Sequence, residues 1–104
     1  MGEDKINNLL VRNNIRFLRE VKFPDLKDKG YLRFDFGILN ADNQIIKLIE
    51  YDGRQHTDTT SVWYNETLVR HDQMKNEYCE KHSIPLIRIP YTKLSNLTVE
   101  DLID

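Results

Sequence analysis

Carboxylates placed where apolar segments end or are interrupted are the residues of this chain best suited to chemistry. Asp35 stands between two phenylalanines, and Glu50 and Asp52 close a run of aliphatic residues. Side chains alternate along a strand, so Glu50 and Asp52 share one face, and a hairpin turn at 40–43 would bring that face toward Asp35. Clustered carboxylates repel each other and are costly to desolvate, so a fold usually keeps them for a cation. Ligation by oxygen alone at Asp35, Glu50 and Asp52 suits magnesium, manganese or calcium rather than zinc, and of these we expect Mg²⁺ or Mn²⁺.

Each of these acids also has a structural interpretation. Glu50 and Asp52 would serve as the solvated end of a strand, with Asp52 and the following glycine forming an ordinary turn. For Asp35 the alternative is a buried ion pair with one of three arginines: Arg33, Arg16 or Arg19.

A histidine and a second acid complete a possible hydrolytic set. His56 follows the run that contains Glu50, and an imidazole beside a metal and a phosphate is the usual general base near neutral pH. Asp72 would orient that imidazole by holding one ring nitrogen. Read in isolation, His56 is a bystander in a loop and Asp72 forms a surface ion pair with Lys75, one helical turn later.

Polar residues flank this set and could hold phosphates of a nucleic acid, although each also has an ordinary reading as a surface residue: Arg33, Arg54, Gln55, Arg70 and Lys75. The whole chain, however, carries 15 Lys and Arg against 17 Asp and Glu, a net charge of -2. Few phosphates can then be neutralised, so we expect most DNA affinity to come from a homodimer partner or from an additional DNA-binding region of a longer chain.

The elements that must position these residues follow from hydrophobic periodicity. The 104 residues suit a single domain of the mixed α/β (α+β) class, with a small central sheet and flanking helices in the order αβββαβ. The strand at 44–51 is apolar on both parities and is therefore placed centrally, covered on both faces. The expected elements are a helix at 3–13, strands at 15–23, 32–38, 44–51 and 84–90, a helix at 65–82, and a terminal helix opened by a capping box at 98–101.

Composition excludes several classes. The chain has one cysteine, Cys79, which cannot form an internal disulfide and which we read as a core residue. His71 and His82 are read as solvated helix residues. No apolar run is long enough to span a membrane, and the first residues lack the apolar core of a signal peptide, so we expect an intracellular, cytoplasmic protein.

Several motifs in order resemble the PD-(D/E)XK nuclease superfamily: "LRFDF", "IIKLIEYDGRQH", "RHDQMKNEYC" and "IPLIRIPY". More narrowly, they resemble the very short patch repair endonucleases and related phage homing endonucleases described by an EDxHD pattern. The resemblance extends from Glu3 to Tyr91 and implies a restriction-endonuclease-like core.

The resemblance assigns a role to each residue of the pattern. It implies that Asp35 binds the metal, that His56 activates water and that Asp72 is the acid paired with His56. Glu3 matches the leading glutamate, in the metal's hydration shell, with Glu20 as a rival.

One position departs from the superfamily. The lysine expected two residues after Glu50 is Asp52, which shifts proton handling to the histidine, as this branch would imply. The sequence thus predicts a magnesium-dependent endodeoxyribonuclease domain. The alternatives are a nuclease fold that kept DNA or protein binding without catalysis, and a phosphoesterase acting on RNA or small phosphates.

Overall fold

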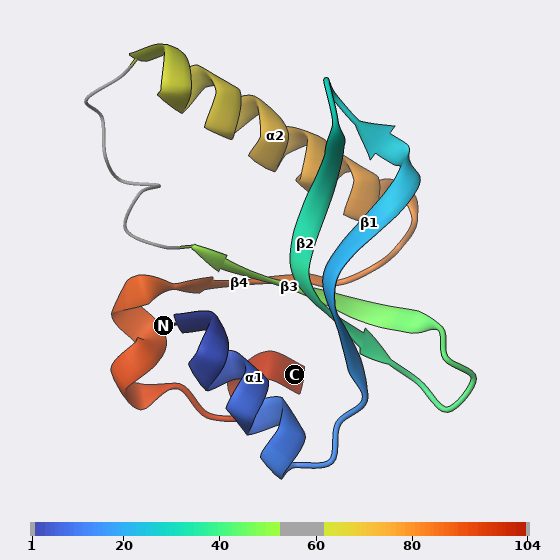
Figure 1. Ribbon diagram of the computed structural model, residues 1–104, viewed down its shortest axis with the longest axis vertical. Coiled ribbons are helices and arrows are strands. Elements are labelled where there is room, and N and C mark those ends of the chain that lie inside the picture. The colour runs from blue at the N-terminus through green and yellow to red at the C-terminus, as the bar shows by residue number, and fades with distance from the viewer. Residues whose placement is uncertain (1, 53–61, 104) are drawn as a thin grey trace.

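The computed structural model describes residues 2–52 and 62–103, with side chains described from residue 66 onward in the second segment (Figure 1). The predicted αβββαβ order and mixed α/β class are confirmed. The elements in chain order are α1 (Gly2–Arg12), β1 (Phe17–Lys27), β2 (Tyr31–Leu39), β3 (Ile45–Asp52), α2 (Val62–Lys81), β4 (Leu86–Pro90), the 3₁₀ helix η2 (Tyr91–Asn96) and α3 (Glu100–Ile103).

The strands form one mixed sheet in the order β1-β2-β3-β4. β1 pairs with β2, and β2 with β3, in antiparallel fashion, whereas β4 runs parallel to β3 after the crossover through α2. The central place predicted for β3 is confirmed. Leu48 and Ile49, adjacent along this strand, are both fully buried and contribute to different hydrophobic clusters, so both faces of β3 are covered.

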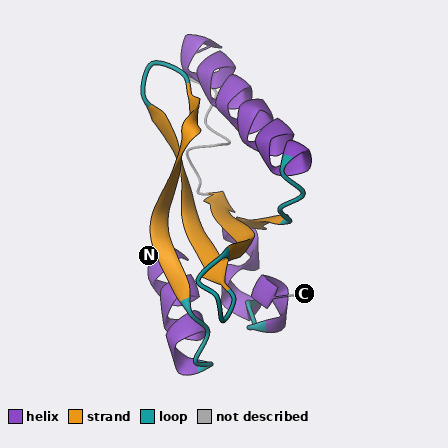
Figure 2. Cartoon of the chain, turned by 90° about the vertical axis from the view of Figure 1, so that its right-hand side faces the viewer, coloured by secondary structure: helices purple, strands orange, loops and turns teal. Residues whose placement is uncertain are grey.

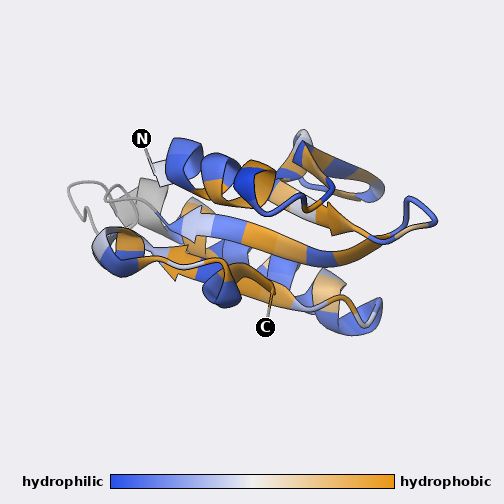
Figure 3. Cartoon of the chain, turned by 90° about the horizontal axis from the view of Figure 1, so that it is seen from below, coloured by the Kyte–Doolittle hydropathy of each residue, from blue (hydrophilic) through white to orange (hydrophobic). Residues whose placement is uncertain are grey.

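Two hydrophobic clusters pack on opposite faces of the sheet. The first cluster joins α1 and α3 to the sheet and contains Ile6, Leu10, Phe36, Ile38, Ile49, Ile89, Leu97 and Leu102. The second cluster joins α2 to the sheet and contains Val21, Leu26, Leu32, Phe34, Leu48 and Cys79. Apolar colour accordingly concentrates on the strands in Figure 3, and α1 shows blue on its outer side.

Alternation of apolar and polar residues in the predicted strand at 32–38 would place its apolar residues on one face of the sheet. In β2 they lie on two faces instead. Phe34 enters the second cluster and Phe36 the first. The ladder between β2 and β3 is recorded only from the pair Phe36–Ile49 onward, and on the neighbouring strand Glu20 has a left-handed φ of 52°. β1 and β2 therefore twist away from the rest of the sheet as a two-stranded extension, visible in Figure 2. We call this extension, residues 20–35, the ribbon.

The predicted end of the first strand at Pro24 is wrong. β1 continues to Lys27, which pairs with Tyr31 after an irregularity in register, and the turn occupies only residues 28–30. Proline is tolerated because β1 is an edge strand, where a backbone N–H is not needed on the open side.

Other boundaries differ by a few residues, and η2 was not predicted. α2 begins at Val62, and β4 begins at Leu86. The capping box is confirmed, since the Thr98 N–H donates to Asp101 Oδ2 at 2.9 Å. The first helix ends close to the predicted residue 13, at Arg12, and Asn14 just beyond it has a left-handed φ of 56°, which asparagine tolerates at a helix end. Among the described helices, none is both long and apolar enough to cross a membrane.

Candidate functional site

Asp35 lies at the point where the ribbon leaves the sheet. The pairs recorded between β2 and β3 begin with Phe36 and Ile49, and next to them Asp35 Oδ2 accepts a hydrogen bond of 2.7 Å from the backbone N–H of Tyr51. A carboxylate thus takes the place of a backbone carbonyl at this position. This contact fixes Asp35 beside Glu50, as the sequence predicted.

Glu50 is the only charged or polar side chain found buried in the described part of the chain, with 6% of its surface exposed. The ammonium of Lys75, on α2, is ion-paired with Glu50 Oε1 and lies 5.5 Å from the centre of the Phe34 ring. Burial raises the pKa of Glu50 to about 8 against the pull of Lys75, and the adjacent carboxylate of Asp35 adds to the rise. Two carboxylates therefore lie together, of which Glu50 is buried and paired with the ammonium of Lys75.

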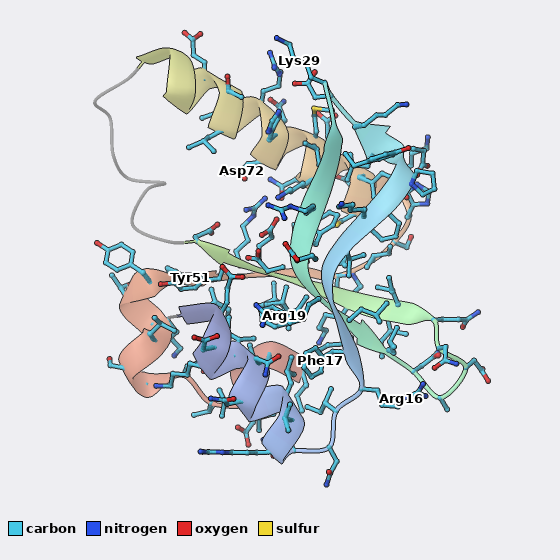
Figure 4. The ribbon with its side chains drawn as sticks, in the orientation of Figure 1. Arg16, Phe17, Arg19, Lys29, Tyr51 and Asp72 are labelled. Carbon is cyan, nitrogen blue, oxygen red and sulfur yellow. The ribbon has the colours of Figure 1, made fainter. Side chains whose placement is uncertain are left out.

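Arg88 connects the strands of the site to α2. It is paired in register with Glu50 on the neighbouring strand, but its guanidinium lies 3.5 Å from Asp52 Oδ1 and 3.4 Å from Asp72 Oδ1. The same group donates to the Asp72 backbone carbonyl at 3.3 Å and to Asn76 Oδ1 at 3.0 Å. Asp72 faces the sheet from α2 (Figure 4). Arg88 thereby holds Asp52 and Asp72 in one network.

The ion pairs considered as structural alternatives, Asp35 with an arginine and Asp72 with Lys75, are not the ones that form. None of the three arginines considered for Asp35 is paired with it: Arg16 contacts Asn40 and Asn43, and Arg19 and Arg33 bind glutamates. Lys75 is paired with Glu50, while Asp72 is paired with Arg88.

The two glutamates considered for the leading position lie elsewhere on the molecule. Glu3 Oε1 is 3.3 Å from Arg19, whose guanidinium lies over the Phe36 ring of the first cluster. Glu50 faces the other side of the sheet, so Glu3 is not brought to it, and its proposed role stays a prediction. Glu20 is exposed and bound to Arg33.

Of the predicted DNA contacts, two lie in ion pairs away from Glu50. Arg33 is bound to Glu20, and Arg70 lies 2.6 Å from Asp28. Arg54, Gln55 and the predicted base His56 lie outside the described residues.

The two helix histidines were expected to be solvated, and the structure corrects this for His71. Its Nε2 is 3.1 Å from Asp28 Oδ2, and 29% of the side chain is exposed. His82 is exposed, stacks on Tyr78 with ring centres 4.2 Å apart, and has Nε2 3.7 Å from Asp25. Cys79 is buried in the second cluster, and burial raises the pKa of its thiol, as suits a core residue.

The donor set suits a hard cation but is incomplete in the described part of the chain. There, no three His, Cys, Asp or Glu side chains are grouped to hold a metal. The pair Asp35 and Glu50 offers two carboxylates in contact, of which one is buried and balanced by a single ammonium. Such a pair gains from a divalent ion, because the carboxylate of Asp35 helps to raise the pKa of Glu50 and a cation would offset that effect.

Sequence reasoning missed Arg88 and Asn76 as members of this site. The signal for Arg88 was an arginine inside an apolar strand expected beside the strand of Glu50. Asn76 follows Asp72 by four residues on α2, one helical turn, so both face the same way.

Comparison with known proteins shows a family but no function. A family model described as "Protein of unknown function (DUF2726)" matches residues 28–103, nearly three-quarters of the chain. The chain belongs to the DUF2726 family. No curated protein matches the chain, and no solved structure does. The DUF2726 match includes Asp35, Glu50, Lys75 and Arg88, whereas Glu3 lies outside it.

Proposed function

We propose that this domain is a divalent-metal-dependent endodeoxyribonuclease that hydrolyses phosphodiester bonds of double-stranded DNA. The observation that carries the proposal is the contact between Asp35 and the buried Glu50 at the edge where β2 separates from β3. Keeping two acids together away from water is costly, so a bound cation is the best physical reason for them. The resemblance of the surrounding motifs to the PD-(D/E)XK nucleases supplies the reaction class.

Asp35 and Glu50 would hold Mg²⁺ or Mn²⁺, with Asp52 as a further carboxylate on the strand of Glu50. When bound, the ion supplies positive charge to a scissile phosphate. His56 is the proposed base that takes a proton from the attacking water, and Asp72 its orienting acid. Hydrolysis would form a bond from the oxygen of the attacking water to phosphorus and break the bond from phosphorus to the 3′-oxygen, which would leave as a hydroxyl after taking a proton from water.

Lys75 adds an element to this scheme that the sequence did not specify. The position two residues after Glu50 holds Asp52, yet an ammonium reaches Glu50 from α2. A lysine at that place can donate a hydrogen bond to a phosphate oxygen and balance the negative charge that develops during hydrolysis. We therefore add Lys75 to the proposed catalytic residues.

Plasmid cleavage tests the proposal. Supercoiled plasmid incubated with the chain and Mg²⁺ or Mn²⁺ is expected to be nicked or linearised, and EDTA is expected to prevent it. Asp35→Asn and Glu50→Gln remove charge with little change of shape and should each lower the rate by at least about 100-fold. Asp42→Asn, an exposed acid in the turn between β2 and β3, is the matched control and should cleave normally.

Metal binding is measured separately from cleavage. Mn²⁺ should raise the melting temperature of the wild-type chain and of Asp42→Asn, but not of Asp35→Asn, because a ligand that binds only the folded state stabilises it. Cleavage of RNA or of small phosphate esters without cleavage of duplex DNA would contradict the proposed substrate. Cleavage that survives both site substitutions would refute the proposed site.

The charge balance of the site also favours a second candidate, a binding module that kept the nuclease fold without its chemistry. Lys75 and Arg88 already neutralise acids that a metal would need. This module would bind duplex DNA or a protein, show no Mn²⁺-dependent rise in melting temperature, and cleave nothing even when fused to a DNA-binding domain.

A further inference from the structure

The ribbon separates its charges by face. Cross-strand partners share a face of a two-stranded sheet, and Val21 is paired with Phe34, both buried in the second cluster beneath α2. The next pair, Lys22 with Arg33, therefore points away from α2. The pair Lys27 and Tyr31 does so too, because the adjacent Leu26 and Leu32 are buried in the second cluster. All four are exposed.

Two of the three aspartates of the ribbon, Asp25 and Asp28, are held by α2. Asp28 is bound by Arg70 at 2.6 Å and by His71 at 3.1 Å, and these contacts lower its pKa. Asp25 accepts a hydrogen bond of 2.8 Å from the Tyr78 hydroxyl. Asp25 and Asp28 are thus bound to groups of α2 and are not available to pair with the lysines of the ribbon.

The basic side chains of the outer face are only partly balanced. Glu20 binds Arg33, but no acid is ion-paired with Lys22 or Lys29 among the residues that the structure describes. Lys22 and Arg33 lie directly opposite each other, an arrangement of like charges that costs stability. Lys29 stands at the tip of the ribbon (Figure 4).

Aromatic groups lie among these charges. The Tyr31 ring is 53% exposed, and the ammonium of Lys27 lies 5.6 Å from its centre. A shallow hollow of about 190 Å³ is lined by Lys22, Phe23, Pro24 and Tyr31. Basic side chains interleaved with an exposed ring match the phosphates and base edges of a nucleic acid.

We propose that the outer face of the ribbon, formed by Lys22, Lys27, Tyr31 and Arg33, is a docking surface for double-stranded DNA, which Lys29 extends at the tip. The choice of duplex DNA rests on the proposed function. A two-stranded ribbon is of a size to lie along the major groove, and its basic side chains would reach the flanking phosphates. The net charge of the whole chain, -2, does not reveal this basic surface, because the acids that balance its positive charges lie on other parts of the molecule.

An anionic membrane is the competing occupant and fits less well. A membrane-binding surface needs apolar side chains that enter the bilayer. The other large hydrophobic side chains found exposed in the described segments lie outside the ribbon: Val11, Leu18, Ile46, Val69 and Ile103.

The surface faces away from Glu50 and Lys75, which lie on the side of α2. It would therefore supply affinity and orientation and would leave the chemical step unchanged. Removing its charges should raise KM for DNA and leave kcat as it was.

The test measures binding of a fluorescent 20-base-pair duplex in EDTA, over a range of salt concentrations and without cleavage. The double variant Lys22→Gln/Lys29→Gln should bind about tenfold more weakly at low salt, and the slope of log K against log salt should fall by about 1.8, since each phosphate contact contributes about 0.9. The control Arg12→Gln/Lys93→Gln removes the same charge from α1 and η2 and should behave as wild type.

Tyr31→Ala provides a second measurement that leaves the charge unchanged, and it should also weaken binding. Equal losses in the ribbon and control variants, or an unchanged slope, would overturn the docking surface, as would wild-type chain that binds anionic vesicles but not the duplex. The two proposals can fail separately. If the wild-type chain binds the duplex through the ribbon but does not cut plasmid, only the nuclease proposal is refuted. If the chain cuts plasmid and the ribbon variants bind DNA as wild type does, only the docking surface is refuted.

Discussion

At the scale of single residues, Glu50 is the residue whose state decides what the site can do. It is 6% exposed, with one ammonium, that of Lys75, and a second carboxylate, that of Asp35, beside it. Burial raises the pKa of Glu50 to about 8 even with Lys75 in place, so a further, divalent cation would be needed to favour its ionised form near neutral pH. Glu50 therefore links metal binding, proton uptake and stability.

The first prediction concerns the stability of the metal-free chain in EDTA. The folded-state pKa of Glu50 is about 8 against an ordinary 4.5, so the folded chain holds a proton that the unfolded chain loses between these values. The free energy of unfolding should then fall, on the order of a few kcal/mol, as pH rises from about 4.5 to 8. Urea unfolding at pH 5 and pH 9 measures the difference.

Glu50→Gln is the comparison for that measurement. It has no proton to exchange, so it should lose clearly less stability between the two pH values than wild type does. The remaining titratable groups are the same in both proteins, so their contributions cancel in the comparison. Mg²⁺ should flatten the wild-type curve, because a divalent ion favours the ionised carboxylate. Equal pH dependence in wild type and Glu50→Gln would show that Glu50 is ionised throughout.

The sequence predicted the meeting of Asp35 with Glu50 because strand alternation and a hairpin turn determine which residues share an edge. The sequence did not predict the ion-pair partners, because several oppositely charged groups lie within reach of one long side chain. Lys75 could pair with Asp72 along the helix or with Glu50 across the interface. Only the packing of α2 on the sheet selects Glu50.

At the scale of elements, the ribbon and α2 form the unit that creates the site. α2 covers the second cluster, and Arg88 of β4 joins it to β3 through Asp52 and Asp72. The sequence predicted the elements because their periodicity is strong. It shortened β1 at Pro24, since only the sheet order reveals that β1 is an edge strand, where proline is tolerated.

The second prediction follows from the four contacts of Arg88. Arg88→Met keeps the length of the side chain and removes the guanidinium, which leaves Asp52 and Asp72 facing each other without it. The free energy of unfolding should fall by about 1–2 kcal/mol, a moderate loss because these side chains are a quarter to a third exposed. Chemical denaturation measures it.

Arg70→Met is the matched control on the same helix. Its pair with Asp28 is mostly exposed, at 56% for the arginine, and should contribute less than about 1 kcal/mol. If both variants lose equal stability, Arg88 is an ordinary surface arginine. A loss confined to Arg88→Met supports its place in the link between α2 and the sheet.

At the scale of the whole molecule, one four-stranded sheet separates two hydrophobic clusters that pack against different helices. The second cluster supports α2 and the candidate site, and the first packs α1 and α3 on the other face. The sequence could not divide Phe34 from Phe36 between these clusters, because alternation treats a strand as flat and this strand twists.

This division yields the third prediction. Leu102 of α3 is fully buried in the first cluster, so Leu102→Ala removes about 2–5 kcal/mol from the free energy of unfolding. Because natural domains have about 5–15 kcal/mol in total, the loss should be obvious in a thermal melt. Ile103→Ala, next to it and 42% exposed, is the control and should change stability far less.

The same pair of variants separates folding from function. Leu102 packs on the face of the sheet away from Glu50, so the Leu102→Ala molecules that remain folded at low temperature should bind Mn²⁺ as wild type does. Metal titration at 10 °C, with the folded fraction measured in parallel by circular dichroism, gives the affinity per folded molecule. If the Mn²⁺ affinity falls together with stability, the two faces are coupled through the sheet. If the affinity stays as in wild type, the packing of the first cluster does not affect metal binding at the candidate site.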